Sequence, residues 1–415
     1  MTAAISVSSL FSTQSPKLTA LPPLSLYVHI PWCVKKCPYC DFNSHEIGKK
    51  GNALPEDEYV SALIRDLEMA LPQIWGRPVS SVFLGGGTPS LLSAQAVDKI
   101  LTHVRMLLPL ELSTEITLEA NPGTFEAQKF ADFRAAGINR LSIGVQSFNP
   151  RHLQALGRIH DDKEAHHAIE IALKNFDNVN LDLMYALPDQ TLEEARHDIA
   201  FACASGVQHI SAYHLTLEPN TLFYRFPPTL PDDDLAAEMQ LMIEQTVSSR
   251  GYANYETSAF AKPNYQSRHN LNYWQFGDYL GIGAGAHSKI SFQHKIIRQM
   301  RYKQPRQYLT KILAKDGALG DPIQSEHEIQ GEDRAFEFMM NALRLISGFQ
   351  VESFQARTGL PITAIQQQLK EAEQRGLISW DHHCIMPSLT GRRFLNDLLQ
   401  IFLPEKRKNC IQIND

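Results

Sequence analysis

Residues 30–40 read Ile-Pro-Trp-Cys33-Val-Lys-Lys-Cys37-Pro-Tyr-Cys40, and this stretch decides how the rest of the chain is interpreted. Three cysteines lie at the spacing C-x3-C-x2-C, directly after an apolar run at Leu24–Ile30. Thiolates are the usual ligands of iron–sulfur clusters, and a full cluster normally takes four of them. Three ligands on one loop leave the fourth iron open to a small molecule, much as a catalytic zinc keeps an open position. The stretch therefore predicts a [4Fe–4S] cluster held by Cys33, Cys37 and Cys40.

A zinc site completed by His29 or His45 is the alternative for the same loop. Zinc knuckles favour paired C-x2-C units over a triplet of this spacing, so the cluster is the better interpretation. The other cysteines, Cys203, Cys384 and Cys410, are far apart in the chain. That usage suits a reducing compartment with a metal site, and we expect a cytoplasmic protein.

Length and composition describe a large globular chain. At 415 residues two folded units are expected, and 43% hydrophobic with 20% charged residues is typical of globular proteins. The net charge of −6 argues against a broad nucleic-acid-binding surface. No apolar run reaches the 18 residues that a membrane span needs, although peripheral membrane contact stays open. We expect neither a nucleic-acid partner nor a transmembrane segment.

Short β-rich runs alternate with helical patterns from Leu24 to about Pro219. Strands are predicted at Leu24–Ile30, Val79–Leu84, Glu115–Ala120, Arg140–Val145, Asn180–Tyr185 and His209–Leu215. Helices are predicted at Glu56–Leu71, Ala94–Leu107, Phe125–Ala136, Asp161–Lys174 and Leu192–Ala204, with cap-like residues at Ser93, Thr124 and Thr191. This repetition predicts an α/β fold with a parallel sheet and right-handed crossovers. Six such units predict a partial (βα)6 barrel rather than a closed eight-stranded one.

The alternation stops after Pro219. One helix is predicted at 232–249, then a Gly-rich and aromatic-rich stretch around 252–292, and a mainly helical final part that ends in Leu389–Leu403. Asp316, Gly317, Gly320, Asp321 and Pro322 predict a boundary near residue 320. We therefore expect a disordered N-terminal extension at 1–23, the barrel and its extension at 24–320, and a mainly helical domain at 321–415. The first 20 residues lack the features of a secretory signal, and a transit peptide is poorly supported without Arg.

Residues 351–387 fit a winged-helix-like element, with two helices around Gly359 and a hairpin near Trp380. DNA binding is one interpretation of such an element. The helix predicted at Ile362–Arg375 opposes Lys370 and Arg375 with Glu371 and Glu373, which leaves no basic face. We expect a packing element instead.

Polar residues follow the ends of the predicted strands, where barrels of this type build their sites. Gly85-Gly86-Gly87-Thr88-Pro89 ends the second strand; its glycines let a ligand approach and offer free N–H groups to a carboxylate. Three later strands place Glu119, Gln146 and Asp182, whose oxygens can bind ribose hydroxyls, and Arg158 can pair with a carboxylate. Each one alone is equally an ordinary polar residue at a barrel rim.

The cysteine motif, with Tyr39 just before its last cysteine, resembles the signature of the radical S-adenosylmethionine (SAM) superfamily. The resemblance implies that the open iron binds SAM, which one electron then cleaves to a 5′-deoxyadenosyl radical. From about Leu24 to Leu403 the chain resembles the oxygen-independent coproporphyrinogen oxidase subgroup. This implies SAM contacts by Tyr27, Tyr39, Gly86, Gly87, Thr88, Glu119, Gln146, Arg158 and Asp182, with weaker matches at Thr216 and His287.

Two departures separate the chain from the oxidases of that subgroup. The oxidase pattern has a fourth cysteine where this chain has Phe42, and it has a longer N-terminal arm than the 26 or so residues before Tyr27. Both departures favour the HemW-type heme chaperones, whose HNxxYW motif resembles His269-Asn270-Leu271-Asn272-Tyr273-Trp274. An imidazole can ligate heme iron, and Tyr and Trp offer flat apolar faces. The alternative is that Tyr273 and Trp274 are core aromatics and His269 a structural histidine.

The resemblance implies a chaperone that carries a [4Fe–4S] cluster and SAM, binds heme as cargo, and passes it to acceptor hemoproteins, with respiratory ones among the candidates. Whether the protein is also an enzyme stays open, and no catalytic residue is assigned. Two alternatives remain: an oxidative decarboxylase of coproporphyrinogen III, and another porphyrin-directed radical enzyme, because a complete cofactor site normally performs chemistry.

Overall fold

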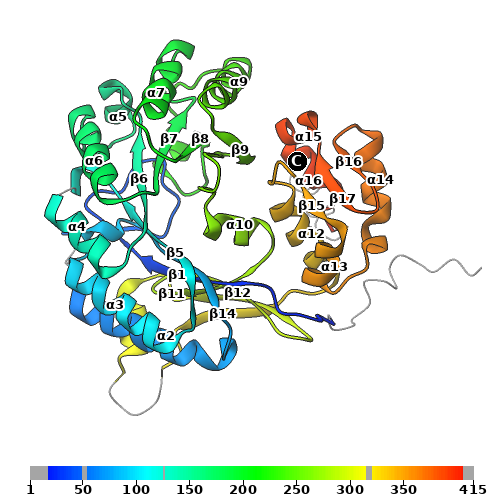
Figure 1. The fold of residues 1–415 in the computed structure, drawn as a ribbon, viewed down its shortest axis with the longest axis horizontal. Helices are drawn as coiled ribbons and strands as arrows, with labels where there is room; N and C mark the ends of the chain where they lie inside the picture. The colour runs from blue at the N-terminus through cyan, green and yellow to red at the C-terminus, as the bar shows by residue number, and fades with distance from the viewer. Residues whose placement is uncertain (1–16, 49–53, 125–126, 315–319, 405–415) are drawn as a thin grey trace, which may run out of the picture.

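The computed structural model describes residues 17–48, 54–124, 127–314 and 320–404. Three features of the sequence analysis lie outside these ranges: most of the predicted extension at 1–23, the helix start expected at Phe125, and Cys410. The described residues form a twelve-stranded sheet with helices around it and a smaller domain beside it (Figure 1). This is the α/β barrel followed by a helical domain that the sequence predicts.

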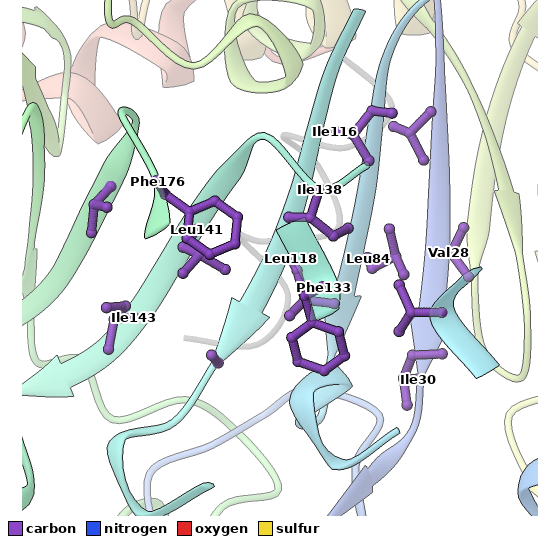
Figure 2. Packing of buried hydrophobic residues seen from close by; sticks show 14 of the residues in the cluster. Val28, Ile30, Leu84, Ile116, Leu118, Phe133, Ile138, Leu141, Ile143 and Phe176 are labelled. Atoms are coloured by element: carbon purple, nitrogen blue, oxygen red, sulfur yellow. The ribbon is translucent and has the colours of Figure 1, made fainter. Parts of the chain in front are cut away.

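Six parallel strands form the barrel part of the sheet. In spatial order they are β1 (Leu24–Ile30), β4 (Val79–Gly86), β5 (Leu110–Ala120), β6 (Arg140–Gln146), β7 (Val179–Tyr185) and β8 (His209–His214). Their apolar side chains are buried; Val28, Leu84 and Leu141 are each 0% exposed. Figure 2 shows these side chains packed with Phe133 in the core. Parallel strands covered on both faces read as near-continuous apolar runs, which is why the sequence located all six.

Crossover helices connect the strands; of the three predicted cap residues, Ser93 and Thr191 cap two of these helices, and Thr124 lies in a 3₁₀ turn. The crossover helices are α2 (Glu56–Ile74), α3 (Ala94–Leu107), α4 (Ala127–Ala136), the short α5 (Pro150–Ala155), α6 (Asp162–Asn175) and α7 (Leu192–Ala204). The Ser93 hydroxyl accepts the Ala96 N–H at the start of α3, and Thr191 forms a capping box with Glu194 at the start of α7. Between them lie two 3₁₀ turns, Pro89–Leu91 and Pro122–Thr124.

Six further strands extend the sheet beyond the barrel, and the sequence did not reveal them. Strands β10 (Ala259–Ala261) and β9 (Ala253–Glu256) follow β8 at one edge. At the other edge β11 (Asp278–Ile282), β12 (His287–Ser291), β13 (Ile296–Arg301) and β14 (Ile323–Glu328) follow β1. The extension also holds the helices α8 (Leu222–Arg225), α9 (Asp233–Ser249), α10 (Arg268–Trp274) and α11 (Pro305–Ile312).

The boundary predicted near residue 320 falls before the last strand of the sheet. Strand β14 still pairs with β13, from Ile297↔Glu328 to Arg301↔Ile323. Its sequence, Ile-Gln-Ser-Glu-His-Glu, is almost wholly polar because this edge strand is exposed over nearly its whole length. The sheet therefore continues to Glu328.

The C-terminal domain has its own core. It contains α12 (Gly331–Ala342), α13 (Val351–Thr358), a 3₁₀ turn (Ile362–Ile365), α14 (Gln366–Gln374), α15 (Leu389–Arg393) and α16 (Leu395–Ile401). A small sheet combines β15 (Phe349–Gln350), β16 (Ile378–Trp380) and β17 (Cys384–Pro387). Two predicted helices differ in detail: the one at Ile362–Arg375 opens with the 3₁₀ turn, and Leu389–Leu403 is interrupted at Phe394.

Figure 1 shows the C-terminal domain beside the barrel, with α10 between the two. Phe276, just after α10, packs edge-on against Phe338 of α12, and Arg298 forms an ion pair with Glu337 at 2.7 Å. None of the described helices combines the length and apolar content needed to cross a bilayer.

Candidate functional site: two adjoining cavities

The three predicted cluster ligands lie on the loop that follows β1. This loop includes a short pairing of β2 (Trp32–Cys33) with β3 (His45–Glu46), which folds it back on itself. All three thiols are free, half-buried, and line one cavity of about 360 Å³. Hydrogen-bond donors approach two sulfurs: the Thr88 hydroxyl lies 3.5 Å from Cys33 Sγ, and Arg158 Nη1 lies 3.6 Å from Cys37 Sγ. Three thiol ligands, cationic neighbours and an adjoining space fit an iron–sulfur cluster with one open iron.

The zinc alternative loses one of its two completing ligands. His29 is buried, its Nδ1 lies 2.9 Å from the Tyr27 hydroxyl, and its Nε2 lies 2.9 Å from the Asn43 carbonyl oxygen. Both ring nitrogens are therefore occupied. Burial lowers the pKa of His29 to about 4, so the ring is neutral at physiological pH.

Most of the residues predicted to contact SAM come together around the same cavity. Its lining includes Tyr39, Gly86, Gly87, Thr88, Glu119, Gln146, Arg158 and Asp182, and also the weaker match Thr216. They lie at the C-terminal ends of successive strands, as expected for such a barrel. Tyr27, His269 and His287 do not line this cavity.

The glycine loop differs from its prediction. Its N–H groups are not free: Gly86 donates to Glu119 Oε2 at 3.0 Å, Gly87 to the Ile30 carbonyl at 2.8 Å, and Thr88 to the Trp32 carbonyl at 2.7 Å. The other glycine property holds, because Gly86 has a φ of 113° and a Cβ on Gly87 would lie 2.5 Å from Trp32 O. The backbone of the glycine loop therefore packs closely against the start of the cysteine loop, and the cavity lies beside it.

Arg158 is held in place by groups that the sequence did not single out. Its Nη2 lies 2.6 Å from Asn121 Oδ1 and 2.6 Å from the Gly144 carbonyl, and Asn121 in turn donates to the Thr88 hydroxyl at 2.8 Å. Burial alone would lower the pKa of Arg158, but Tyr39 and Cys37 beside it raise that pKa instead. The position of Asn121, two residues after Glu119 at a strand end, was the available signal.

Two carboxyl groups share the interior of the barrel. Burial raises the pKa of Glu119 to about 7, and the nearby Asp182 adds to this shift. Burial also raises the pKa of Asp182, although hydrogen bonds from Ser142 and Asn180 oppose it. Both groups are therefore poised to respond to a ligand that brings positive charge or hydroxyl donors.

A second cavity, of about 870 Å³, adjoins the first and shares Cys40, Gly86 and Glu119 with it. Tyr27 and His269 line this second cavity, as does His287. The wider lining also includes Phe83, Tyr273, Trp274, Tyr279, Lys36 and Lys303. The structure thus gathers the predicted HNxxYW residues with one wall of the predicted SAM site.

The helix α10, which carries that motif, is anchored from inside the barrel. Ser267 caps it, and Glu115 on β5 accepts the N–H groups of Arg268 and His269 at 3.2 Å each. His269 stacks on Phe83 with 4.7 Å between ring centroids, and its Nδ1 lies 3.3 Å from the Ser81 hydroxyl. Burial, with Arg140 nearby, lowers the pKa of His269 to about 3. The neutral ring retains a lone pair that can ligate a metal.

The two aromatic residues of the motif also pack against protein groups. Tyr273 stacks on Tyr279 at 4.8 Å, and the Arg344 guanidinium lies 4.3 Å from the centre of the Trp274 ring. Each ring therefore contributes to packing and also lines the cavity. Trp274 Nε1 is buried without a hydrogen-bond partner among the described residues.

Comparison with known proteins matches the radical SAM superfamily model at residues 27–202 and the HemN C-terminal domain model at residues 329–394. The heme chaperone HemW of Escherichia coli K12 is 47% identical, covering 94% of this chain and 100% of that protein. HemW of Haemophilus influenzae is 45% identical, covering 93% of this chain and 99% of that protein.

Among solved structures, the coproporphyrinogen III oxidase HemN of Escherichia coli, a radical SAM enzyme, is similar with a TM-score of 0.77 and 22% identity. The match covers 92% of this chain and 90% of that one, and it shows a shared fold. The identity to HemW, 47% along nearly all of both chains, is about twice the 22% identity to HemN. The chain therefore belongs to the HemW family of the radical SAM superfamily.

Proposed function

We propose that the protein is a heme chaperone: it holds heme in the second cavity and transfers it to acceptor hemoproteins, with a [4Fe–4S] cluster and SAM in the first cavity. The observation that carries this proposal is the second cavity itself. A wall rich in aromatic rings, with a neutral His269, adjoins the cavity that the three cysteines line. The two relatives at 47% and 45% identity are heme chaperones by name, which supports the proposal.

The lining of the second cavity is amphipathic, as heme is. Tyr27, Phe83 and Tyr273 provide apolar faces, while Lys36 and Lys303 provide positive charge suited to two propionates. Its volume of about 870 Å³ lies within the usual range for small-molecule sites. Burial of a porphyrin face against aromatic rings contributes on the order of a few kcal/mol even without an iron bond.

In the first cavity, Cys33, Cys37 and Cys40 would hold the cluster, and Glu119, Arg158 and Asp182 would hold SAM. When bound, these two groups supply one-electron radical chemistry. The residues of the chain do the positioning. Asn121 and the Gly144 carbonyl fix the guanidinium of Arg158, while Ser142 and Asn180 orient the carboxylate of Asp182.

The oxidase is the second candidate, because the cofactor cavity is complete and HemN has the same fold. Phe42 argues against it. This side chain stands where the oxidases have a fourth thiol, is 61% exposed, and lines both cavities. A phenyl ring cannot ligate metal or carry a proton, so it cannot replace that thiol.

The test of the chaperone proposal is a transfer experiment. Protein loaded anaerobically with cluster and hemin is mixed with an excess of an apo b-type cytochrome, and the absorbance of the acceptor is followed. We expect the acceptor to gain heme faster than from an equal amount of heme on serum albumin, a carrier with no transfer role. Heme that stays on the protein, or reaches the acceptor no faster than from albumin, would contradict the proposal. Cys37→Ala is expected to lose the iron–sulfur absorption.

A further inference from the structure

A buried chain of hydrogen bonds runs through the barrel interior, starting at Asp182 of the first cavity. Asn180, two residues earlier on β7, lies 2.9 Å from Asp182 Oδ1 through its Nδ2. Asn180 Oδ1 lies 2.6 Å from His209 Nδ1, and His209 Nε2 lies 2.8 Å from the Tyr255 hydroxyl. The Tyr255 hydroxyl oxygen in turn accepts the Ser267 N–H at 3.3 Å.

The far end of this chain is the helix of the second cavity. Ser267 is the N-cap of α10, and its hydroxyl accepts the Asn270 N–H at 3.3 Å. Along α10 follow His269, Tyr273 and Trp274, which line the second cavity. The chain therefore begins at a predicted SAM contact and ends at the helix that carries the predicted heme contacts, crossing from β7 to β8 to β9 on the way.

The direction of the bonds follows from Asn180. Its Nδ2 donates to Asp182 and its Oδ1 can only accept, so His209 carries a hydrogen on Nδ1 and donates it to Asn180. In a neutral ring Nε2 then accepts the hydrogen of the Tyr255 hydroxyl, whose oxygen accepts the Ser267 N–H. This pattern needs a neutral imidazole. Burial and the nearby Arg140 lower the pKa of His209 well below its usual value, which keeps the ring neutral.

The chain is closed to solvent over its middle. Asn180 is 1% exposed, His209 0%, Tyr255 5% and Ser267 0%. In such a low-dielectric interior a hydrogen bond is strong and an unpaired polar group is costly, so neighbouring links reinforce one another.

We propose that this chain couples the two cavities, with His209 and Tyr255 as positioning residues, so that SAM held at Asp182 tightens heme binding along α10 and heme tightens SAM binding. The inference rests on the proposed function. SAM that binds Asp182 changes the hydrogen bond that Asn180 makes with it, and because a buried polar group is costly to leave unpaired, the change is passed from link to link to the N-terminus of α10. Coupling of this kind is reciprocal by thermodynamic necessity.

A substitution can interrupt this chain of hydrogen bonds without releasing α10. Glu115 accepts the N–H groups of Arg268 and His269 from a different strand, and the Ser267 hydroxyl still caps α10. Tyr255→Phe removes one hydroxyl and therefore interrupts the chain while α10 stays anchored. His209→Leu interrupts it one residue earlier, and Asn180 Oδ1 then keeps the Ser211 hydroxyl at 3.1 Å.

The experiment measures hemin affinity with and without SAM, and SAM affinity with and without hemin, on anaerobic cluster-loaded protein without reductant. In the wild type we expect each ligand to tighten the other by the same factor, about five-fold or more. In Tyr255→Phe and His209→Leu we expect that factor to fall to about one, within the two-fold precision of such titrations.

Tyr252→Phe is the matched control. The Tyr252 hydroxyl is also buried in this region, but it donates to the Val207 carbonyl at 2.5 Å and takes no part in the chain. We expect Tyr252→Phe to keep the wild-type factor by which each ligand tightens the binding of the other. Three results would overturn the coupling alone: a factor of one in the wild type, a factor that survives in both Tyr255→Phe and His209→Leu, or loss of the factor in Tyr252→Phe. Wild-type protein that binds neither hemin nor SAM would overturn the proposed function as well.

Discussion

Glu119 lines both cavities. Its carboxylate oxygen Oε2 accepts the Gly86 N–H, and burial followed by the charge of Asp182 raises its pKa to about 7. For an acid, a raised folded-state pKa favours the folded state below the ordinary value near 4.5, and this contribution is lost as the pH rises through about 7. A cationic ligand that binds the ionised carboxylate of Glu119 has the opposite effect, because it favours the deprotonated form.

We therefore expect SAM affinity to depend on pH through Glu119. SAM carries a sulfonium and ribose hydroxyl donors, so the ionised carboxylate binds it better, and binding should weaken about ten-fold from pH 8 to pH 6. Glu119→Gln should bind more weakly at pH 8 and lose most of this dependence. Calorimetry at pH 6, 7 and 8 measures both effects, and Glu193→Gln on the exposed surface of α7 is the control. An unchanged pH profile in Glu119→Gln contradicts the assignment.

Lys303 tests the polar end of the second cavity. Lys36 already donates to the Phe42 carbonyl at 2.9 Å, whereas the exposed Lys303 side chain lines the cavity with no hydrogen bond or ion pair among the described residues. Lys303→Glu should weaken hemin binding about five-fold at low salt, and less at high salt, because it opposes the propionates with a negative charge. Lys99→Glu on α3, which lines neither cavity, should have no effect. Equal effects of the two substitutions would contradict a propionate contact.

At the residue scale, the sequence indicated side chains whose chemistry is visible in a short motif. Cys33, Cys37, Cys40 and Arg158 come together as expected. It did not indicate partners supplied from distant strands, such as Tyr279 against Tyr273 or Tyr255 against His209. These pairs exist only once the sheet brings the strands side by side.

At the scale of elements, the parallel strands could be predicted and the extension could not. A strand buried on both faces is an apolar run, and the sequence predicts amphipathic helices between these strands, three of them with a cap residue. Strands β12 and β13 instead carry buried polar residues such as Lys289 and Arg301, which a sequence pattern reads as surface. Their charges are satisfied only by tertiary partners: Lys289 pairs with Asp278 at 2.8 Å, and Arg301 with Asp66 at 3.3 Å.

Asp278 holds the extension to the barrel, and its loss should be costly. Its carboxylate accepts from Lys289 and Arg77 at 2.8 Å each and also from the Ser291 hydroxyl at 2.8 Å, all in the protein interior. Asp278→Asn leaves two cations without their anion and should lower the free energy of unfolding by about 3–5 kcal/mol. Urea unfolding measures this, and exposed Asp98→Asn on α3 should change it by less than about 0.5 kcal/mol. A loss no larger than that of the control would show that the network does not hold the extension.

At the scale of the molecule, the C-terminal domain packs behind one wall of the second cavity. Arg344, at the end of α12, covers the Trp274 ring and pairs with Glu256 at 3.3 Å, and the Ile346 N–H donates to the Tyr255 carbonyl at 3.1 Å. The domain is thus packed directly behind α10. The sequence predicted a helical packing unit here, but not that it packs against the HNxxYW helix, because that contact joins segments about 70 residues apart.

The central claim is that the protein binds heme and does not decarboxylate coproporphyrinogen. One anaerobic sample loaded with cluster decides it: hemin is titrated into one half, and the other half receives SAM, reductant and coproporphyrinogen III. The account predicts saturable hemin binding, a shifted heme spectrum in His269→Ala with most of the affinity retained, and no protoporphyrinogen. Repeated turnover to protoporphyrinogen with no saturable hemin binding would contradict it and identify an oxidase.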